Sequence, residues 1–262
     1  MRRKLDGLRM LITGASSGIG RSMAILAAEA GAKLLLTARR EDRLEELLGV
    51  LHAKGCDARY VVGDITDPAH RQRLVERAES DFRGLDVLVN NAGVGAYGSF
   101  EDATPERLRT LMEVNFFAPV ELTRLVLPIL EKGTTPAVCN ISSVLAHRAV
   151  PGKSEYCASK FALHGFSDAL RAEVSSKGID VILVSPSTTS SEFAAAVIEK
   201  RGKVPAKGKF VRTPHNVAVA ALRAIRLGRH EIIPSKTGFA MILLDRLCPS
   251  LADWAVAKFG YV

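Results

Sequence analysis

A tyrosine and a lysine lie four residues apart in the segment SEYCASKFALHGFSDALRAEV, residues 154–174. Apolar residues recur there at every third or fourth position, which predicts a helix. The spacing places Tyr156 and Lys160 on one face of that helix, one turn apart. The pair is either an ordinary surface contact or a device for proton transfer, and the rest of the chain must distinguish the two.

Coulomb's law indicates what such a pair could do. A free tyrosine has a pKa of about 10, which is too high for a base at neutral pH. An ammonium about 4 Å away, at an effective dielectric constant of about 20, favours the phenolate by about 4 kcal/mol. That energy corresponds to about three pKa units, although burial of the phenolate opposes the shift. We therefore expect Lys160 to lower the pKa of Tyr156 by less than this amount.

Bulk composition limits the class of protein. The chain has 262 residues, of which 47% are hydrophobic and 24% are charged, enough for one large core in a single α/β domain. The longest uncharged stretch near the C-terminus, TGFAMILL, is much shorter than the roughly 18 apolar residues of a spanning helix. The N-terminus, MRRKLDGLRMLITG, lacks the apolar region of a signal peptide. We expect a cytoplasmic protein.

Cysteine spacing argues against a cysteine-based metal site, and the distribution of charge argues against a nucleic-acid-binding protein. The four cysteines are scattered, without a CxxC pair or a nearby pair of histidines, so we expect reduced thiols and no metal site. The formal net charge of +8 has a local source, because residues 200–230 contain nine Lys and Arg residues and no acid. That segment has one aromatic residue, Phe210, so base stacking and nucleic-acid binding are not expected. A solvated lid and helix face is the favoured interpretation.

Strand and helix patterns alternate along the chain. Seven short runs rich in Val, Ile and Leu predict strands buried on both faces, at residues 9–13, 33–38, 58–63, 85–91, 137–142, 180–186 and 230–234. Helical patterns lie between them, at residues 19–31, 41–55, 68–82, 105–131, 154–174 and 215–228. This alternation predicts an α/β fold in which helices cover both faces of a parallel sheet.

Two segments depart from the alternation. Residues 187–212 are rich in Ser, Thr, Gly, Pro and Lys, and a long irregular segment in a compact domain is usually a lid or binding loop. Residues 237–262 contain two amphipathic helical patterns separated by Cys248-Pro249. We therefore divide the chain into one domain, residues 1–236, and a helical tail, residues 237–262. The apolar stripe of the tail needs a cover, and a partner subunit is favoured over the pocket mouth or a membrane surface.

The stretch TGASSGIG, Thr13 to Gly20, follows the first strand and opens the first helix. Glycine permits a tight turn and a close approach of phosphate to the backbone. The helix N-terminus adds unpaired N–H groups and a partial positive charge. A glycine turn alone is weak support, but its position between a buried strand and a helix is the one that a dinucleotide-binding site requires.

Residues after the second and third strands bear on the choice of cofactor. The second strand ends in Ala38-Arg39-Arg40, where an acid would favour NAD and an arginine suits a 2′-phosphate. Arg39 is either a solvated residue at a helix start or a contact to NADP, and its place at the strand end favours NADP. Asp64, at the end of the third strand, either lies beside the adenine or caps the helix that starts at Pro68.

Taken together, these segments resemble the short-chain dehydrogenase/reductase family over roughly residues 5–235. TGASSGIG is similar to the cofactor turn of the family, and NNAG, Asn90 to Gly93, to its motif after the fourth strand. VNFFAP places Asn115 at the position of the active-site Asn of the family. NISS and YCASK place Ser143 thirteen residues before Tyr156, followed by Lys160. The chain departs from the family at Pro186-Ser187, where Pro-Gly is usual.

The resemblance implies a Rossmann-type doubly wound seven-stranded sheet of order 3-2-1-4-5-6-7 and an NADP(H)-dependent oxidoreductase that interconverts a carbonyl and an alcohol. Tyr156 would be the general acid or base, Ser143 would bind the substrate oxygen, Lys160 would hold the nicotinamide ribose, and Asn115 would anchor a proton-relay water. The substrate would be a small to medium apolar molecule that contacts Ser143, Leu145, Tyr156 and Val94. NAD(H) is the less favoured cofactor. The expected cofactor contacts are Gly14, Ser16, Ser17, Gly18, Ile19, Gly20, Arg39, Arg40, Asp64, Ile65, Asn91, Ala92, Gly93, Tyr156, Lys160, Pro186, Thr189 and Ser191.

Two other classes of protein remain to be weighed. A catalytically idle NADP-binding sensor could share this fold, but it would not need Ser143, Tyr156 and Lys160 together. A peripheral membrane binder could use the tail and the basic segment 200–230, although the charges of the tail nearly cancel. We expect an enzyme that forms a homodimer or homotetramer.

Overall fold

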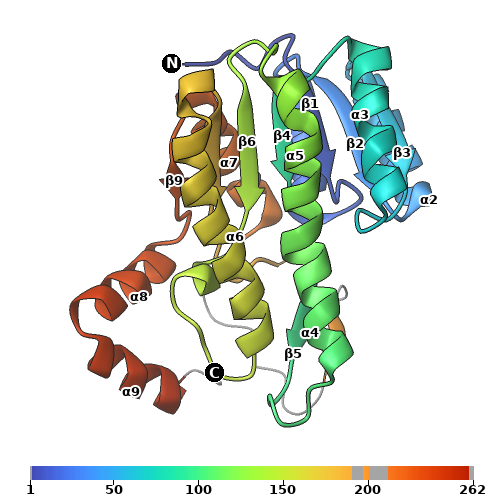
Figure 1. The fold of residues 1–262 in the computed structure, drawn as a ribbon. Coiled ribbons are helices and arrows are strands. Elements are labelled where there is room, and N and C mark those ends of the chain that lie inside the picture. Colours follow the sequence, from blue (N-terminus) through green and yellow to red (C-terminus); the bar gives the residue numbers. More distant parts are fainter. Residues whose placement is uncertain (1, 191–196, 201–211, 260–262) are drawn as a thin grey trace.

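Residues 2–190, 197–200 and 212–259 are described in a computed structural model of the chain. A parallel sheet of order β3-β2-β1-β4-β6-β7-β9 lies at its centre (Figure 1). Numbered along the chain, these seven strands have the order 3-2-1-4-5-6-7, which confirms the predicted topology. The strands are β1 (Arg9–Thr13), β2 (Lys33–Ala38), β3 (Ala58–Val62), β4 (Val87–Asn90), β6 (Ala137–Ile141), β7 (Asp180–Val184) and β9 (Glu231–Ile232).

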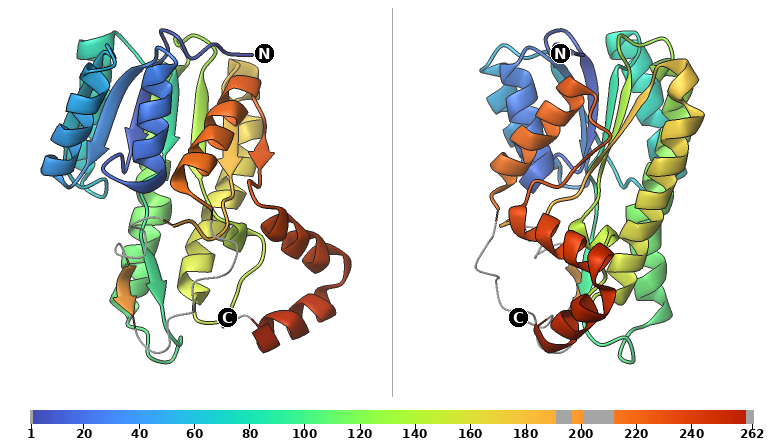
Figure 2. Two further views of the ribbon diagram at one scale, coloured as in Figure 1. Left: turned by 180° about the vertical axis from the view of Figure 1, so that it is seen from behind. Right: turned by 90° about the vertical axis from the view of Figure 1, so that its left-hand side faces the viewer.

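Helices cover both faces of this sheet, as the views in Figure 2 show. One face is covered by α1 (Gly18–Glu29), α2 (Glu41–His52) and α7 (Pro214–Leu227). The other is covered by α3 (Pro68–Phe82), α5 (Ala118–Leu130) and α6 (Ser154–Glu173). A short 3-10 helix, η3 (Ser175–Lys177), precedes β7. The architecture is the Rossmann-type doubly wound sheet expected from the sequence.

The strands are apolar throughout because both of their faces are buried. Successive side chains of a strand point to opposite faces. Leu34 and Leu36 accordingly lie in the core beneath α1 and α2, whereas Leu35 lies in the core beneath α3 and α5. All three are fully buried. The lack of alternation in the sequence is therefore explained by the two-sided cover.

The helical run predicted over residues 105–131 is interrupted. It consists of α4 (Pro105–Met112), a π-helical turn η1 (Glu113–Phe117), and α5. The buried side chain of Asn115 lies in that turn. The prediction of one continuous helix over these residues was therefore wrong. Such π-helical turns often occur at functional sites.

A second, two-stranded sheet was not predicted. The strand β5 (Gly95–Tyr97) pairs in parallel with β8 (Val197–Lys200). β8 falls inside the segment 187–212, which was expected to be irregular. Four residues of that segment therefore form a strand that the sequence analysis did not predict. Most of that segment, residues 191–196 and 201–211, lies outside the described residues.

The tail forms two helices, α8 (Lys236–Leu247) and α9 (Pro249–Phe259), as predicted. Arg148 joins both to the body of the protein, because its Nη1 donates to Asp245 Oδ1 at 2.7 Å and its Nη2 donates to Asp253 Oδ1 at 2.6 Å. The apolar side of the tail is largely uncovered in the single chain. Five large apolar side chains are exposed there, namely Phe239, Leu243, Leu247, Leu251 and Trp254.

The thiols differ in exposure. Cys56, Cys139 and Cys157 are buried, whereas Cys248 is exposed between α8 and α9, and none of the four forms a disulfide. Among the helices that the structure describes, none combines the length and the apolar character needed to cross a membrane.

Candidate active site

The glycine turn after β1 is fastened to the end of β4. Asn91 donates from Nδ2 to the carbonyl oxygens of Thr13 (2.9 Å) and Gly14 (3.1 Å). The hydroxyl of Thr13 in turn accepts from the backbone N–H groups of Asn91 and Ala92 at 2.9 and 3.0 Å. Gly14 has a φ of +65°, and a Cβ there would lie 2.8 Å from Ala92 Cα. Only glycine therefore fits between these two strand ends.

The first helix begins directly after this turn. Ser17 is its N-cap residue, and the Ser17 side chain makes no hydrogen bond to the first turn. That turn reads Gly18-Ile19-Gly20-Arg21 and contains no acid. The unpaired N–H groups and the helix dipole make such an end suitable for a phosphate group.

The two arginines after β2 lie at the solvent edge of the same site. The side chain of Arg39 is 68% exposed, and its Nη1 lies 4.0 Å from Asp64 Oδ2. Arg40 Nη2 donates to Ser16 Oγ at 3.2 Å, beside the glycine turn. Both cations follow the end of β2, and Arg40 contacts the glycine turn directly.

Asp64 has a local structural partner. Its Oδ1 accepts from the backbone N–H and the hydroxyl of Thr66 at 2.9 and 2.8 Å. The cap of α3 is a different residue, Asp67, which accepts from Ala69 N at 2.9 Å. The alternative that Asp64 caps this helix is therefore wrong. Its neighbour Ile65 is buried against the helix layer.

Ser143 and Tyr156 meet beyond the end of β6. Ser143 begins a short 3-10 helix, η2 (Val144–Ala146), and its Oγ accepts from Leu145 N at 3.1 Å. A hydrogen bond also joins the Ser143 and Tyr156 side chains. The two residues expected to bind one substrate oxygen are therefore adjacent.

The pKa of Tyr156 is displaced in the opposite direction to that expected. Burial raises it above the ordinary value of 10.0, and the hydrogen bond with Ser143 offsets this only in part. The expectation of a lowered pKa was wrong for the protein alone, because Lys160 Nζ lies 5.9 Å from the centroid of the Tyr156 ring and desolvation exceeds its attraction. The phenol is thus protonated at neutral pH.

Lys160 is held in the interior. Its exposed fraction is 4%, and Nζ donates to the carbonyl oxygen of Ile141 at 3.1 Å. Burial lowers the pKa of Lys160 from 10.5 to about 8. A lysine with such a pKa can exchange a proton near neutral pH.

Asn115 connects the segment between β4 and β5 to α6. Its Oδ1 accepts from Val94 N at 2.9 Å, and its Nδ2 donates to Val94 O and Ser159 Oγ, each at 3.0 Å. Ser159 Oγ donates onward to the carbonyl of Tyr156 at 2.7 Å. A Cβ on Gly93 would lie 3.1 Å from Asn115 Oδ1 and 3.7 Å from Lys160 Nζ. Gly93 therefore allows both side chains to approach the same point.

Apolar residues adjoin this group. Val94 packs in a small cluster with Ala96 and Leu111, against which the Tyr156 ring lies. Leu145 is partly buried. His147, which follows η2, bonds through Nε2 to Glu231 Oε1 at 2.8 Å.

The segment after β7 contains the last of the expected cofactor contacts. Pro186 is buried, and its carbonyl accepts from Val144 N at 3.0 Å. Thr189 Oγ1 donates to Ser187 O at 3.0 Å. Ser191, another expected contact, lies outside the described residues.

Sequence reasoning missed three supporting residues. Ser159 links Asn115 to Tyr156, and its only sequence signal is that it directly precedes Lys160. Arg107 and Glu155 form a buried ion pair, in which Arg107 Nε donates to Glu155 Oε2 at 2.7 Å. This pair joins α4 to the first turn of the Tyr156 helix. Its members are 48 residues apart, and no local pattern identifies them.

The glycine turn and the Asn91–Gly93 segment follow the carboxyl ends of β1 and β4, where the strand order reverses, and Arg39, Asp64, Ser143 and Pro186 follow the carboxyl ends of other strands of the sheet. In open α/β sheets this is where nucleotides bind. The fold is that of the nucleotide-binding α/β class, and it groups Ser143, Tyr156, Lys160 and Asn115 at this edge of the sheet.

Comparison with known proteins gives the family. The family described as short chain dehydrogenase matches residues 9–202, and the chain belongs to it. An uncharacterized oxidoreductase of Bacillus subtilis, YxnA, is 34% identical over 99% of this chain and 74% of its own length. A Drosophila melanogaster dehydrogenase/reductase SDR family protein 7-like is 33% identical over 98% of this chain and 82% of its own. A short chain dehydrogenase/reductase from Burkholderia phymatum, solved in complex with NAD, is 25% identical with a TM-score of 0.86, over 95% of this chain and 96% of its own.

The buried lysine gives a prediction on stability. The unfolded chain keeps a lysine pKa of about 10.4, whereas the folded value is about 8. Between these values the unfolded chain binds more protons, so the free energy of unfolding due to Lys160 rises with pH. The rise is at most about 3 kcal/mol, and Lys160→Met should lack it. Urea unfolding of both proteins at about pH 7 and about pH 10 measures the difference.

The control is Lys132→Met, which removes an exposed lysine and should keep the wild-type pH dependence. Parallel pH profiles for the wild type and Lys160→Met would contradict the lowered pKa.

Proposed function

We propose that the protein is an NADP(H)-dependent oxidoreductase that interconverts a carbonyl and an alcohol by hydride transfer. The observation that carries this proposal is the grouping of Ser143, Tyr156 and Lys160, with Ser143 hydrogen-bonded to Tyr156 and Lys160 buried one turn away. An idle nucleotide sensor would not need a phenol and an ammonium in this arrangement, since each costs desolvation energy.

The residues present fit a dinucleotide. Gly14 and Gly20 let Asn91 and Ala92 pack directly against the turn at the start of α1, and Gly93 places no side chain between Asn115 and Lys160. Asn91 and Ala92 fix the end of β4 next to that turn. A bound nicotinamide would supply or accept the hydride. Lys160 would hold its ribose, and Pro186 and Thr189 would contact the cofactor; the same contact is expected of Ser191, which lies outside the described residues.

The proton would come from Tyr156. Its phenol is protonated at neutral pH, which suits a general acid in the direction of carbonyl reduction. Ser143 would donate a hydrogen bond to the same substrate oxygen and stabilise the negative charge that develops there. Lys160, with a pKa of about 8, would return a proton to Tyr156. Asn115 would position the water that links Lys160 to solvent.

The preference for NADP(H) rests on Arg39 and Arg40. Both follow β2, where no carboxylate occupies the strand end, and Arg40 already contacts Ser16 in the glycine turn. The solved relative from Burkholderia phymatum holds NAD, so the preference proposed for this chain rests on these local charges.

The substrate would be a small to medium apolar ketone, aldehyde or alcohol. Val94 and Leu145 flank Ser143 and Tyr156, and both are apolar. Tyr97 adds an aromatic ring, and burial raises the pKa of its phenol. Hydrophobic walls with a few polar groups are typical of such a site.

The tail would contribute to assembly. We treat residues 1–236 as the catalytic domain, with 187–212 as its lid, and residues 237–262 as a tail that joins subunits into a homodimer or homotetramer. The exposed Phe239, Leu247 and Trp254 support this role, because a contiguous apolar surface favours association.

Replacement of Tyr156 by Phe should abolish turnover while cofactor binding survives. The ring still packs, but the transferable proton is lost. Steady-state assays with NADPH and a panel of apolar carbonyl compounds measure turnover, and fluorescence titration measures cofactor binding. Tyr60→Phe, on β3 and remote from the site, is the control. Near-normal turnover by Tyr156→Phe would mean that another group donates the proton.

Replacement of Arg39 and Arg40 by Ala should weaken NADPH binding at least about tenfold and leave NADH binding little changed. A charge-assisted hydrogen bond contributes about 1.5–3 kcal/mol, and about 1.4 kcal/mol is a factor of ten. Titration of both cofactors at one ionic strength measures the change. The claim fails if the wild type binds the two cofactors equally or if the double variant keeps the preference.

Deletion of residues 237–262 should lower the oligomeric state measured by light scattering. The deletion removes the exposed apolar side chains of α8 and α9. Leu247→Ser combined with Trp254→Ser tests the same surface with the helices retained. A wild-type mass distribution in both proteins would exclude the tail as the subunit contact.

A further inference from the structure

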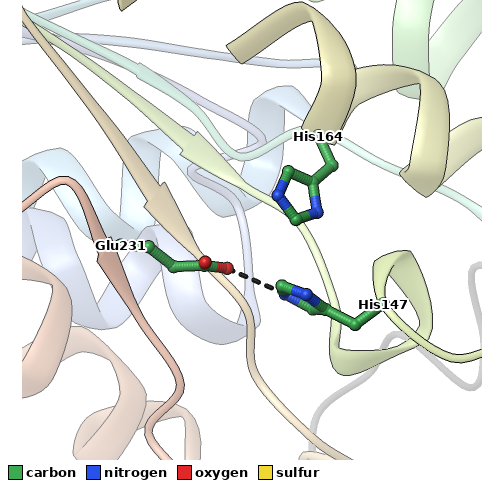
Figure 3. A group of neighbouring side chains, drawn as sticks. All are labelled: His147, His164 and Glu231. Carbon is green, nitrogen blue, oxygen red and sulfur yellow. Dashed lines mark hydrogen bonds and ion pairs between the residues drawn. The ribbon is translucent and has the colours of Figure 1, made fainter. Parts of the chain in front are cut away.

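Two histidines and a glutamate converge outside the group of Ser143, Tyr156 and Lys160. His147 follows η2, His164 lies in α6, and Glu231 lies in β9. Figure 3 shows the three side chains directed toward one another. One potential ligand atom from each residue lies within 4.8 Å of those from the other two.

The contacts within this group are close. His147 Nε2 lies 2.8 Å from Glu231 Oε1, and the rings of His147 and His164 lie 4.5 Å apart at 66°. Ser185 Oγ donates to Glu231 Oε1 at 3.0 Å. The carboxylate is therefore oriented by a neighbour as well as by His147, and the pKa of Glu231 is lowered because these hydrogen bonds outweigh the effect of its burial.

Both ring nitrogens of His164 have an oxygen neighbour. Nδ1 lies 3.3 Å from the carbonyl oxygen of Ala146, and Nε2 lies 3.3 Å from Asp168 Oδ2. Whichever nitrogen binds an ion, the other can donate to an oxygen atom. This second contact is the usual companion of a metal-binding histidine, because it fixes the ring and its tautomer.

Solvent can reach the group. A surface pocket between α6 and α8 is lined by His147, His164, Phe161, Ile242, Asp245 and Arg246. The side chains of Glu231 and His164 are partly exposed, and that of His147 is buried. An ion could therefore enter without unfolding of the site.

We propose that His147, His164 and Glu231 bind a divalent transition-metal ion, with Zn²⁺ the best match. Imidazole together with carboxylate suits Zn²⁺ and its neighbours, whereas Mg²⁺ and Ca²⁺ prefer sites made of oxygen alone. Three protein ligands leave one tetrahedral position for water. The side chains need to separate only slightly, since the His147–Glu231 contact must open to admit the ion.

The site would connect three segments of the candidate active site. His147 is four residues after Ser143, His164 is one helical turn after Lys160, and Ser185 directly precedes Pro186. A bound ion would hold these segments together and would stabilise the folded chain by mass action.

The test is calorimetric titration of the untagged full chain with Zn²⁺ near pH 7.5. We expect one ion per chain and a rise in melting temperature. His164→Gln and Glu231→Gln should each weaken binding at least about tenfold, because a three-ligand site loses one ligand. His215→Gln, which alters an exposed histidine in α7, is the matched control and should bind as the wild type does.

Circular dichroism shows whether each variant is folded. X-ray absorption at the zinc edge of the loaded wild type is independent of the variants, and two imidazoles in its ligand shell would support the site. The proposal is overturned by an absence of saturable binding, by equal losses in the control, by full binding in His164→Gln and Glu231→Gln, or by a shell without two imidazoles.

Discussion

The side-chain amide of Asn115 is the junction on which the candidate active site depends. It pairs with both backbone polar groups of Val94 and with Ser159, so it holds the segment between β4 and β5 against the helix that carries Tyr156 and Lys160. Val94 is buried, and its N–H and C=O groups would both remain unpaired if the amide were lost, at a cost of about 1–3 kcal/mol per group. The π-helical turn is the local deformation that directs Asn115 toward them.

Sequence patterns were sufficient for most of the fold. Two-sided burial requires continuously apolar strands, and the turn requires a positive φ at Gly14. Both requirements are visible in short stretches of neighbouring residues. The π-helical turn, the β5–β8 pair and the Arg107–Glu155 pair arise from contacts between distant segments, so no local signal precedes them. The site residues were found through the order of several motifs, and Ser159 escaped because a serine inside a helix carries no comparable pattern.

The predicted direction of the shift in the Tyr156 pKa was wrong, and burial is the reason. Helical spacing correctly put Tyr156 and Lys160 one turn apart, but it carries no information on how far each is removed from water. Lys160 lies in the interior, and its own pKa is lowered by the burial that raises the pKa of Tyr156. Both groups are therefore biased toward their uncharged forms, which disfavours a fixed phenolate–ammonium ion pair in the protein alone.

The unequal exposure of the four cysteines makes the chain suitable for selective chemical labelling. Thiolates are the species that react with alkylating reagents, and burial raises the pKa of the Cys139 thiol to about 12 and also raises the pKa values of Cys56 and Cys157. Cys248 is exposed between α8 and α9. A maleimide dye is expected to attach at Cys248, the junction of α8 and α9, and would report on its surroundings without any substitution in the protein.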